Sequence, residues 1–329
     1  MVAVRRGDVT ATLAAGESVL DGLARHGVTL PSSCRAGACQ SCLVRAVAGT
    51  PPPAAQQGLR EGLRRQGYFL ACCARPQEDL ELAEGDADLD VEATVTVLDR
   101  LAPDVVRVGL RPARSLGHRA GQFVTVTPPG GPSRAYSIAS ASDAPELELH
   151  VRAIPGGAVS GWLAERARVG DRVTLRGPAG ECFYVAGRAE QPLLLAGTGT
   201  GIAPLFGLLQ DALREGHRGR IVVVHGSVAR EGQYLETSLA ALAAAHAQLE
   251  VHHAVLQGEP GCAPGAHARC SVWGGSIASV VASVVPSPKG FNITLCGDPS
   301  VVAGMRRALF LAGAALTEIR ADAFLPSAA

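Results

Sequence analysis

The sequence is poor in aromatic residues and carries no net charge. Aromatic residues make up only 4% of its 329 residues, and Lys plus Arg and Asp plus Glu both number 30, for a formal net charge of +0. A neutral chain has no overall field with which to hold a nucleic acid or an anionic membrane. We therefore expect no nucleic-acid partner, and any protein partner must be recognised through a local patch.

Long apolar runs are also missing. The first 18 residues hold no apolar stretch of signal-peptide length, and runs such as VVASVVPS (residues 280–287) are too short and too interrupted to span a bilayer. The sequence predicts a cytoplasmic protein with no membrane association. No uncovered apolar surface can be read from the pattern, so we expect a monomer.

Three stretches of different pattern divide the chain. Residues 1–88 hold short alternating runs, one helical run and a loop dense in Cys, Gly and Ser, and they end in an acidic segment. Residues 89–188 hold short β-branched strands punctuated by Gly and Pro, which predicts an antiparallel β-barrel. Residues 189–329 alternate strands and helices, which predicts a doubly wound α/β domain with ligands at the carboxyl ends of its strands. We expect three domains with these boundaries.

The nine cysteines are unevenly spread over a long chain, which favours metal or redox chemistry over a disulfide framework. Cys34, Cys39 and Cys42 have the spacing C-x4-C-x2-C, and Cys72 lies thirty positions beyond Cys42. This spacing is typical of plant-type 2Fe-2S ligation. The alternative is a structural zinc site, although such sites favour two C-x2-C pairs.

The other cysteines have weaker signals. Cys73 adjoins Cys72, and we expect it to face the other side of the same strand. Cys182, Cys262 and Cys270 belong to no ligand pattern, so we expect them to be small, partly buried hydrophobic residues.

PSSCRAGACQSC and YFLACCARP resemble the cluster loop and fourth-ligand segment of plant-type ferredoxins, which implies a β-grasp (α+β) domain. RAYSIAS (134–140) and HVRAIPGGAVSGWL (150–163) resemble the flavin motifs of the ferredoxin-reductase superfamily. That resemblance implies that Arg134 pairs with the flavin pyrophosphate, Tyr136 packs on the ring and Ser137 lies near the reactive N5 position. Without it, Arg134 would be a surface arginine and Tyr136 a barrel core residue.

The same resemblance assigns further flavin contacts. Gly157 and Ser160 would offer a helix N-terminus to phosphate, and His150, Val151 and Arg152 would line the ring and ribose.

GTGTGIAP (197–204) follows an apolar strand and opens a helix, as a nucleotide-binding glycine loop does. It departs from G-x-G-x-x-G, and the next strand ends in His225 instead of an acidic ribose ligand. Together with LCGDPSV (295–301), it resembles the nicotinamide domain of the ferredoxin-reductase family. The implied binding residues are Gly197, Thr198, Gly199, Thr200, Gly201, Pro204, Cys296, Gly297, Asp298 and Pro299.

By this resemblance Cys296 lies beside the reacting carbons without attacking them; the alternative is a buried cysteine at a strand end. The strand LEVHHAVLQ ends without the Ser-Arg pair of NADP-using relatives, which favours NADH, while Arg230 leaves NADPH open. The tail EIRADAFLPSAA resembles the ending of bacterial oxygenase reductases, so Phe324 either approaches the flavin or only packs.

In this order, the three motif sets resemble the reductase components of bacterial multicomponent oxygenases. The resemblance implies electron transfer from NADH to FAD to the 2Fe-2S cluster, and then to a terminal Rieske or di-iron oxygenase or its ferredoxin, as in aromatic hydrocarbon catabolism. A flavin suits this task because it accepts two electrons as hydride and releases them singly. The alternatives are an electron supplier to a deoxysugar dehydratase and a redox-sensing module.

Overall fold

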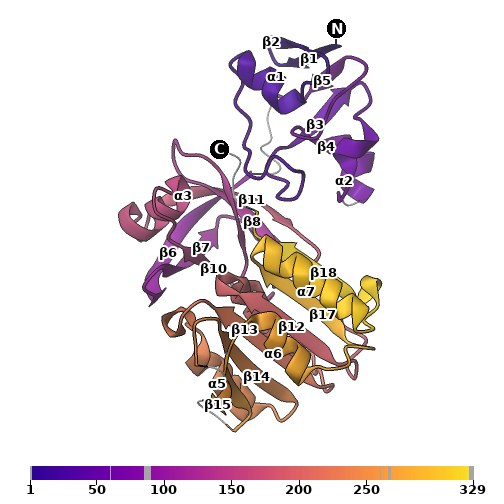
Figure 1. The fold of residues 1–329 in the computed structure, drawn as a ribbon. Coiled ribbons are helices and arrows are strands. Elements are labelled where there is room, and N and C mark those ends of the chain that lie inside the picture. The colour runs from indigo at the N-terminus through magenta and orange to yellow at the C-terminus, as the bar shows by residue number, and fades with distance from the viewer. Residues whose placement is uncertain (1, 60, 85–89, 260, 266–267, 326–329) are drawn as a thin grey trace.

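The computed structural model describes residues 2–59, 61–84, 90–259, 261–265 and 268–325. The chain forms three units that follow one another in sequence (Figure 1). A boundary at residue 88 was expected, and it falls outside the described residues. The boundary expected at residue 188 falls between the last strand of the second unit and the first strand of the third.

The first unit is a small mixed sheet crossed by one helix, which is the predicted β-grasp arrangement. Its strand order is β2-β1-β5-β3-β4, with β1 parallel to β5 and antiparallel to β2. Ser18 starts α1 by accepting a hydrogen bond from the Asp21 amide at 3.2 Å. The elements are β1 (Val2–Arg6), β2 (Val9–Leu13), α1 (Val19–Arg25), β3 (Leu43–Ala48), α2 (Glu61–Arg65), β4 (Tyr68–Leu70) and β5 (Leu80–Leu82).

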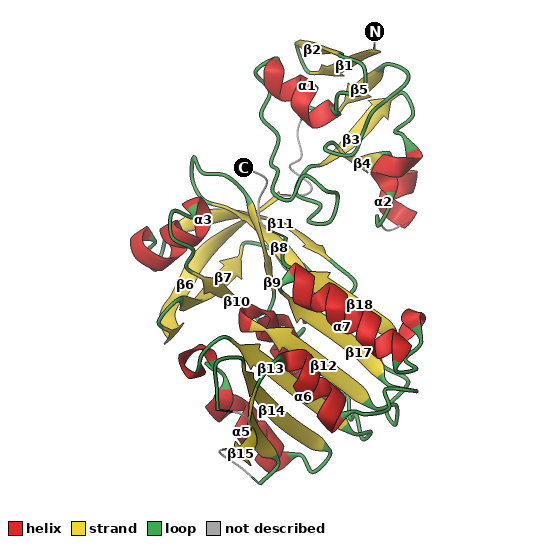
Figure 2. Ribbon diagram, in the orientation of Figure 1, coloured by secondary structure: helices red, strands yellow, loops and turns green. Residues whose placement is uncertain are grey.

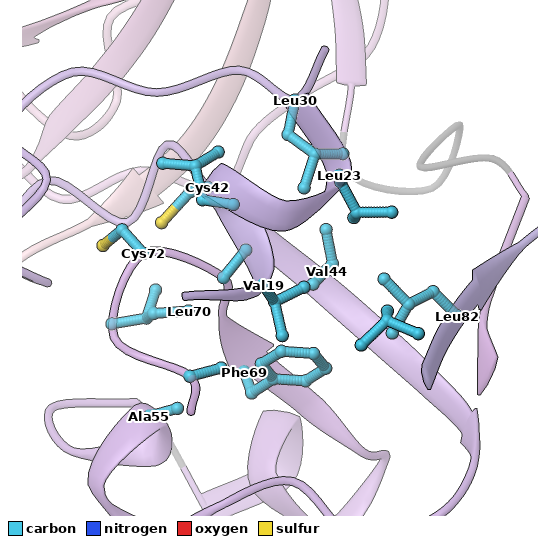
Figure 3. Packing of buried hydrophobic residues seen from close by; sticks show 14 of the residues in the cluster. Val19, Leu23, Leu30, Cys42, Val44, Ala55, Phe69, Leu70, Cys72 and Leu82 are labelled. Atoms are coloured by element: carbon cyan, nitrogen blue, oxygen red, sulfur yellow. The ribbon is translucent and has the colours of Figure 1, made fainter. Parts of the chain in front are cut away.

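The core of this unit is aliphatic and centres on Phe69, which is fully buried. Leu23 from α1 and Val44 from β3 pack in the same cluster. Figure 3 shows Cys42 and Cys72 at one margin of this core. The core therefore anchors two of the predicted ligands directly.

The second unit is a curled sheet of antiparallel pairs in the order β10-β7-β6-β11-β8-β9. A bridge between Ile138, just after β9, and Leu149 of β10 joins the two edges and closes the predicted barrel. The elements are β6 (Asp90–Ala102), β7 (Val105–Pro112), β8 (Phe123–Thr127), β9 (Arg134–Ser137), β10 (Leu147–Arg152), α3 (Ala158–Gly161) and β11 (Arg172–Ala179).

The third unit is a seven-stranded sheet, order β15-β16-β14-β13-β12-β17-β18, in which β15 is the antiparallel edge strand. Strand alternation sends Leu193 and Leu195 to the face covered by α4 and α5, and Leu194 to the opposite face. Figure 2 shows α6 and α7 on that opposite face. The elements are β12 (Leu193–Thr198), α4 (Ile202–Arg214), β13 (Ile221–Ser227), α5 (Glu236–Ala245), β14 (Leu249–Val255), β15 (Gly261–Pro264), β16 (Cys270–Gly274), α6 (Ile277–Val284), β17 (Asn292–Gly297), α7 (Pro299–Leu311) and β18 (Ile319–Ala323).

The strand order reverses at β12, which pairs with β13 on one side and β17 on the other. In a doubly wound sheet, ligands bind at the carboxyl ends of strands beside such a switch point. The predicted α/β domain is confirmed, and its switch point carries both the glycine turn and the Cys296 segment. Within the described residues, no helix is long and apolar enough to cross a bilayer.

Candidate functional site

The cluster loop turns its own amides toward sulfur. The amides of Cys34 and Cys39 each donate to the other's Sγ atom, at 3.4 and 3.3 Å, and the Ala36 amide donates to Cys34 Sγ at 3.4 Å. Gly37 allows this curl with a positive φ of 80°. Amides directed at sulfur stabilise thiolate charge, so the loop is suited to an iron–sulfur cluster.

The four predicted ligands meet as two pairs, Cys34 with Cys39 and Cys42 with Cys72. The hydrogen bond from the Cys39 thiol lowers the pKa of Cys34 to about 5, and the bond from Cys72 lowers the pKa of Cys42. Among the described residues, no group of three or more His, Cys, Asp or Glu side chains is placed to hold one metal ion. Two thiol pairs can supply one pair to each of the two irons of a 2Fe-2S cluster.

Cys73 does not face away from the ligands, so that prediction is wrong. Strand β4 ends at Leu70, and the Cys73 amide donates to the Leu70 carbonyl at 3.0 Å, which closes a turn. Strand alternation no longer applies there, and Cys73 Sγ lies 3.6 Å from Cys72 Sγ.

The three remaining cysteines differ in exposure. Cys182 and Cys270 are buried as expected, whereas Cys262 is exposed, contrary to prediction, because it lies on the edge strand β15. Cys182 also has a partner that the sequence did not indicate, since its thiol is hydrogen-bonded with that of Cys296.

The flavin motif occupies β9, which pairs with β8 so that Ser137 lies opposite Phe123. Arg134 donates to the Ser133 carbonyl at 2.7 Å. Tyr136 packs against the barrel core, and burial raises its hydroxyl pKa. This strand therefore leads from the barrel surface at Arg134 to the third unit at Ser137.

The residues of the second predicted flavin segment (150–163) lie partly in the barrel core and partly at its surface. Val151 is fully buried in the barrel core, while Arg152 pairs with Asp104 at 3.2 Å. The Ser160 hydroxyl accepts from the Ile154 amide at 3.3 Å, and Gly157 precedes α3 as its N-cap.

His150 lies at the junction with the third unit. Its Nε2 atom is 2.8 Å from a Glu148 carboxylate oxygen, and its Nδ1 atom is 3.2 Å from the Tyr234 hydroxyl. The Tyr234 ring also lies edge-on to His225, with centroids 5.7 Å apart. His225 Nε2 is 3.1 Å from the Gly199 carbonyl, and burial lowers its pKa to about 3, so this imidazole is neutral and donates there.

The glycine turn lies where β12 meets β17. Gly199 has a φ of 54°, and a Cβ there would lie 2.3 Å from an Arg152 nitrogen; a Cβ on Gly201 would lie 2.4 Å from the Cys296 carbonyl oxygen. A side chain at Gly199 or Gly201 would therefore push the turn away from Arg152 or from Cys296. The other predicted residues here are Gly197 in β12, Thr198 at its end, Thr200 in the turn and Pro204 in the first turn of α4.

The Cys-Gly-Asp-Pro segment closes the same edge. Thr198 Oγ1 accepts from the Asp298 amide at 3.0 Å. Asp298 in turn starts α7 by accepting from the Ser300 and Val301 amides at 2.9 and 3.1 Å. Its carboxylate therefore caps a helix, and Gly297, with a φ of 120°, makes the close approach to Thr198.

Ser137 and Cys296 come together around a residue that the sequence reasoning missed, Asp322. The Ser137 hydroxyl donates to Asp322 Oδ2 at 3.1 Å, and Asp322 lies opposite Cys296 in the β17–β18 register. Burial raises the pKa of Asp322, and the bond with Cys182 raises that of Cys296. The signal that could have found Asp322 is the single acid in the ADAF tail, two residues before Phe324, whose amide donates to the Gly297 carbonyl at 2.8 Å.

Arg230, the residue that kept NADPH as an alternative donor, forms an ion pair. The Arg230 guanidinium contacts both carboxylate oxygens of Glu236, at 2.7 and 2.6 Å. A paired arginine is less available to a 2′-phosphate than a free one.

Family models match all three units. A 2Fe-2S iron-sulfur cluster binding domain matches residues 2–77, an oxidoreductase FAD-binding domain matches 93–184, and an oxidoreductase NAD-binding domain matches 195–307. The fold and the site thus define an iron–sulfur flavoprotein oxidoreductase that uses a 2Fe-2S cluster, FAD and a nicotinamide nucleotide.

Relatives extend along nearly the whole chain. The ferredoxin–NAD(P)+ reductase component of the Ralstonia naphthalene 1,2-dioxygenase/salicylate 5-hydroxylase systems is 31% identical over 95% of this chain and 94% of its own. The reductase subunit of an Amycolatopsis aromatic O-demethylase is 35% identical over 87% of both chains. The chain belongs to the family of reductase components that transfer electrons in bacterial oxygenase systems.

Solved structures agree with this assignment. The crystal structure of an Amycolatopsis cytochrome P450 reductase superposes with a TM-score of 0.70 at 31% identity, covering 100% of both chains. A ferredoxin reductase in carbazole 1,9a-dioxygenase, at 24% identity, has the same fold, with a TM-score of 0.67 over 98% of this chain and 97% of that one.

Proposed function

We propose that hydride transfer from NADH to the flavin takes place where Ser137, Cys296 and Asp322 meet. The observation that carries this proposal is the Ser137–Asp322 hydrogen bond of 3.1 Å, which joins the end of the flavin strand to the edge of the nicotinamide sheet. Such a bond fixes the Ser137 hydroxyl, and burial favours the neutral form of the Asp322 carboxyl. FAD supplies the conversion of one hydride into two single electrons.

The remaining predicted residues divide into three groups in this proposal. Arg134, Tyr136, His150, Arg152, Gly157, Ser160 and Phe324 surround the flavin, whereas Val151, whose side chain is fully buried in the barrel core, can offer only its backbone. The residues of the glycine turn and of the Cys-Gly-Asp-Pro segment hold the nicotinamide nucleotide. Cys34, Cys39, Cys42 and Cys72 ligate the cluster, two to each iron. The three matched models, at 2–77, 93–184 and 195–307, support domains at 1–88, 89–188 and 189–329.

NADH is the proposed donor. The Arg230–Glu236 pair and the missing Ser-Arg sequence after β14 both support this choice. The proposed acceptor is an oxygenase that acts on an aromatic compound, reached directly or through a ferredoxin. This fits the roles of relatives in naphthalene dioxygenase and phenol monooxygenase systems. We further propose a cytoplasmic monomer, since NADH is a cytoplasmic electron donor.

A P450 acceptor is the second candidate, favoured by one specific observation. A solved chain that is 31% identical and superposes over 100% of both chains is a cytochrome P450 reductase. Reconstitution with purified Rieske, di-iron and P450 oxygenases, scored by product formed per NADH consumed, separates these acceptors.

The test of the core proposal is an anaerobic titration with NADH, followed by visible absorbance and EPR. Bleaching of the flavin together with a rhombic 2Fe-2S signal supports the internal path. Flavin reduction without that signal, with zinc found by elemental analysis, contradicts the cluster. Rapid reduction of ferricyanide under NADH separates a reductase from a redox sensor, which turns over slowly.

A further inference from the structure

The cluster loop is attached to the flavin barrel by a buried arginine. The Arg176 side chain on β11 is only 6% exposed. It binds both carboxylate oxygens of Asp90, at 2.7 and 3.1 Å, and donates to the carbonyls of Ser41 and Leu43 at 3.2 and 3.1 Å. A buried guanidinium is costly unless its charge is paired and its donors are used. Arg176 thus ties the first strand of the barrel to the loop that carries Cys39 and Cys42.

A second contact joins the same loop to β8. Ser41 and Thr125 are 0% and 2% exposed, and their hydroxyl oxygens are 2.9 Å apart. The Ser41 hydroxyl also donates to Cys39 Sγ at 3.1 Å. Since a serine hydroxyl has one hydrogen, the Thr125 hydroxyl must donate to Ser41 while Ser41 donates to the sulfur. Thr125 therefore sets the direction of a hydrogen bond to a cluster ligand.

Thr125 is also adjacent to the flavin strand. In the β8–β9 register it lies opposite Ala135, between the positions that pair with Arg134 and Tyr136. The chain of contacts from Cys39 through Ser41 and Thr125 thus reaches β9 within a few bonds. On the other edge of the loop, Arg35, Ala36 and Ala38 are exposed.

Packing at this junction is incomplete. A cavity of about 220 Å³ lies beside it, lined by Cys39, Thr125 and Arg176 among others. The polar contacts of Thr125 and Arg176 therefore contribute to fixing the loop on the barrel.

We propose that Thr125 and Arg176 are positioning residues for internal electron transfer: they hold the Cys39 edge of the cluster against the flavin barrel. This inference rests on the proposed function. One electron leaves the reduced flavin and enters the oxidised cluster, and no bond forms or breaks at the junction. Loss of the ordered Ser41 hydrogen bond also disfavours the reduced cluster, because such bonds stabilise charge on sulfur.

The test uses two variants and two matched controls in the full-length holoprotein. Thr125→Val removes the hydroxyl at nearly constant volume, and Arg176→Met removes the charge. Thr174→Val and Arg172→Met change exposed residues on the same face of β11, where Arg172 forms a surface pair with Glu92 at 2.9 Å. Anaerobic stopped-flow mixing with NADH separates flavin reduction from cluster reduction, and an EPR-monitored redox titration gives the cluster midpoint potential.

We expect the rate of flavin reduction to be unchanged in all four variants. In Thr125→Val and Arg176→Met, electron transfer from flavin to cluster slows by about tenfold, the factor that corresponds to about 1.4 kcal/mol, near the value of one charge-assisted hydrogen bond. Thr125→Val also shifts the cluster potential to a more negative value, an effect that a merely structural role would not produce.

Equal cluster-reduction rates and potentials in variants and controls overturn the inference. If Arg176→Met does not fold, Thr125→Val decides the matter, since it introduces no buried unpaired charge. Failure of the proposed function looks different: the unmodified protein itself would then show no cluster signal with NADH.

Discussion

The proposed cluster site and the proposed hydride site are built in opposite ways. Three of the four proposed cluster ligands lie within one short loop, and that loop's own amides point at sulfur at 3.3 to 3.4 Å. The hydride site joins Ser137 to Asp322, 185 positions apart, across two domains. A local site depends on its own backbone, whereas a site assembled from distant segments depends on how the domains dock.

The ferredoxin domain and the nicotinamide domain also differ in their buried histidines. The described part of the ferredoxin domain has only His26, which is not buried, whereas the nicotinamide domain buries His217, His225 and His253. Buried neutral imidazoles make a domain sensitive to acid, because the unfolded chain binds protons that the folded chain cannot. The stability of the nicotinamide domain should therefore depend more strongly on pH than the stability of the ferredoxin domain.

The largest expected effect is at the local site. Cys39→Ser should abolish the 2Fe-2S EPR signal, because one iron loses half of its thiolate pair, while NADH still bleaches the flavin. Cys262→Ser, at an exposed cysteine far from the loop, is the matched control and should leave both signals intact. A normal EPR spectrum from Cys39→Ser would mean that another thiol, such as Cys73, ligates the cluster.

The opposite pattern, slow flavin reduction with an intact cluster signal, is expected at the proposed hydride site. Ser137→Ala should slow flavin reduction by NADH about a hundredfold, since it removes a hydrogen-bond donor held in place at the reacting centre. Dithionite should still produce the full cluster signal, which shows that the two sites fail independently. Ser140→Ala, three residues along in the loop after β9, is the control. An unchanged rate in Ser137→Ala would remove Ser137 from the proposed site.

Acid should destabilise the nicotinamide domain first. The folded-state pKa of His225 is lowered to about 3 from an unfolded value near 6.5. Above pH 6.5 the imidazole is neutral in both the folded and the unfolded chain, so it does not affect the free energy of unfolding. As the pH falls below 6.5 only the unfolded chain takes up the proton, and the free energy of unfolding decreases by about 2 kcal/mol at pH 5. Calorimetry at pH 7.5 and 5 should show the larger decrease in the transition that added NADH stabilises.

His225→Gln keeps a donor for the Gly199 carbonyl and should reduce this pH dependence, while the buried His217 and His253 retain their share of it. His246→Gln, at a half-exposed histidine in the same domain, should leave it unchanged. A ferredoxin-domain transition that falls by as much as the nicotinamide transition would contradict the comparison.

The smallest expected effect concerns the nucleotide. Glu236→Gln should raise the kcat/KM ratio of NADPH to NADH by about threefold, because it frees Arg230 from a partly exposed ion pair. Steady-state kinetics with both nucleotides measures this ratio, and Glu231→Gln, in the same turn, is the control. A ratio unchanged in Glu236→Gln would exclude Arg230 from 2′-phosphate recognition.

The tertiary structure corrected the predictions made from sequence at places where the backbone conformation changes over a few residues. Cys73 was expected on the far side of a strand, but β4 ends at Leu70, so a turn brings its sulfur within 3.6 Å of Cys72. Cys262 was expected to be partly buried, but it lies exposed on an edge strand. Element types were predictable from periodicity, whereas the exact residue at which a strand ends depends on packing.

By itself the sequence determined the three fold types and the cofactors, and it supplied the proposed cluster ligands, because these signals are local: the cysteine spacing, the flavin motif and the glycine turn each fit in a short window. Only the tertiary structure brought Asp322 to Ser137, and Thr125 and Arg176 to the cluster loop. Those contacts join residues from different domains, and no periodicity or spacing along one chain records which surfaces will meet.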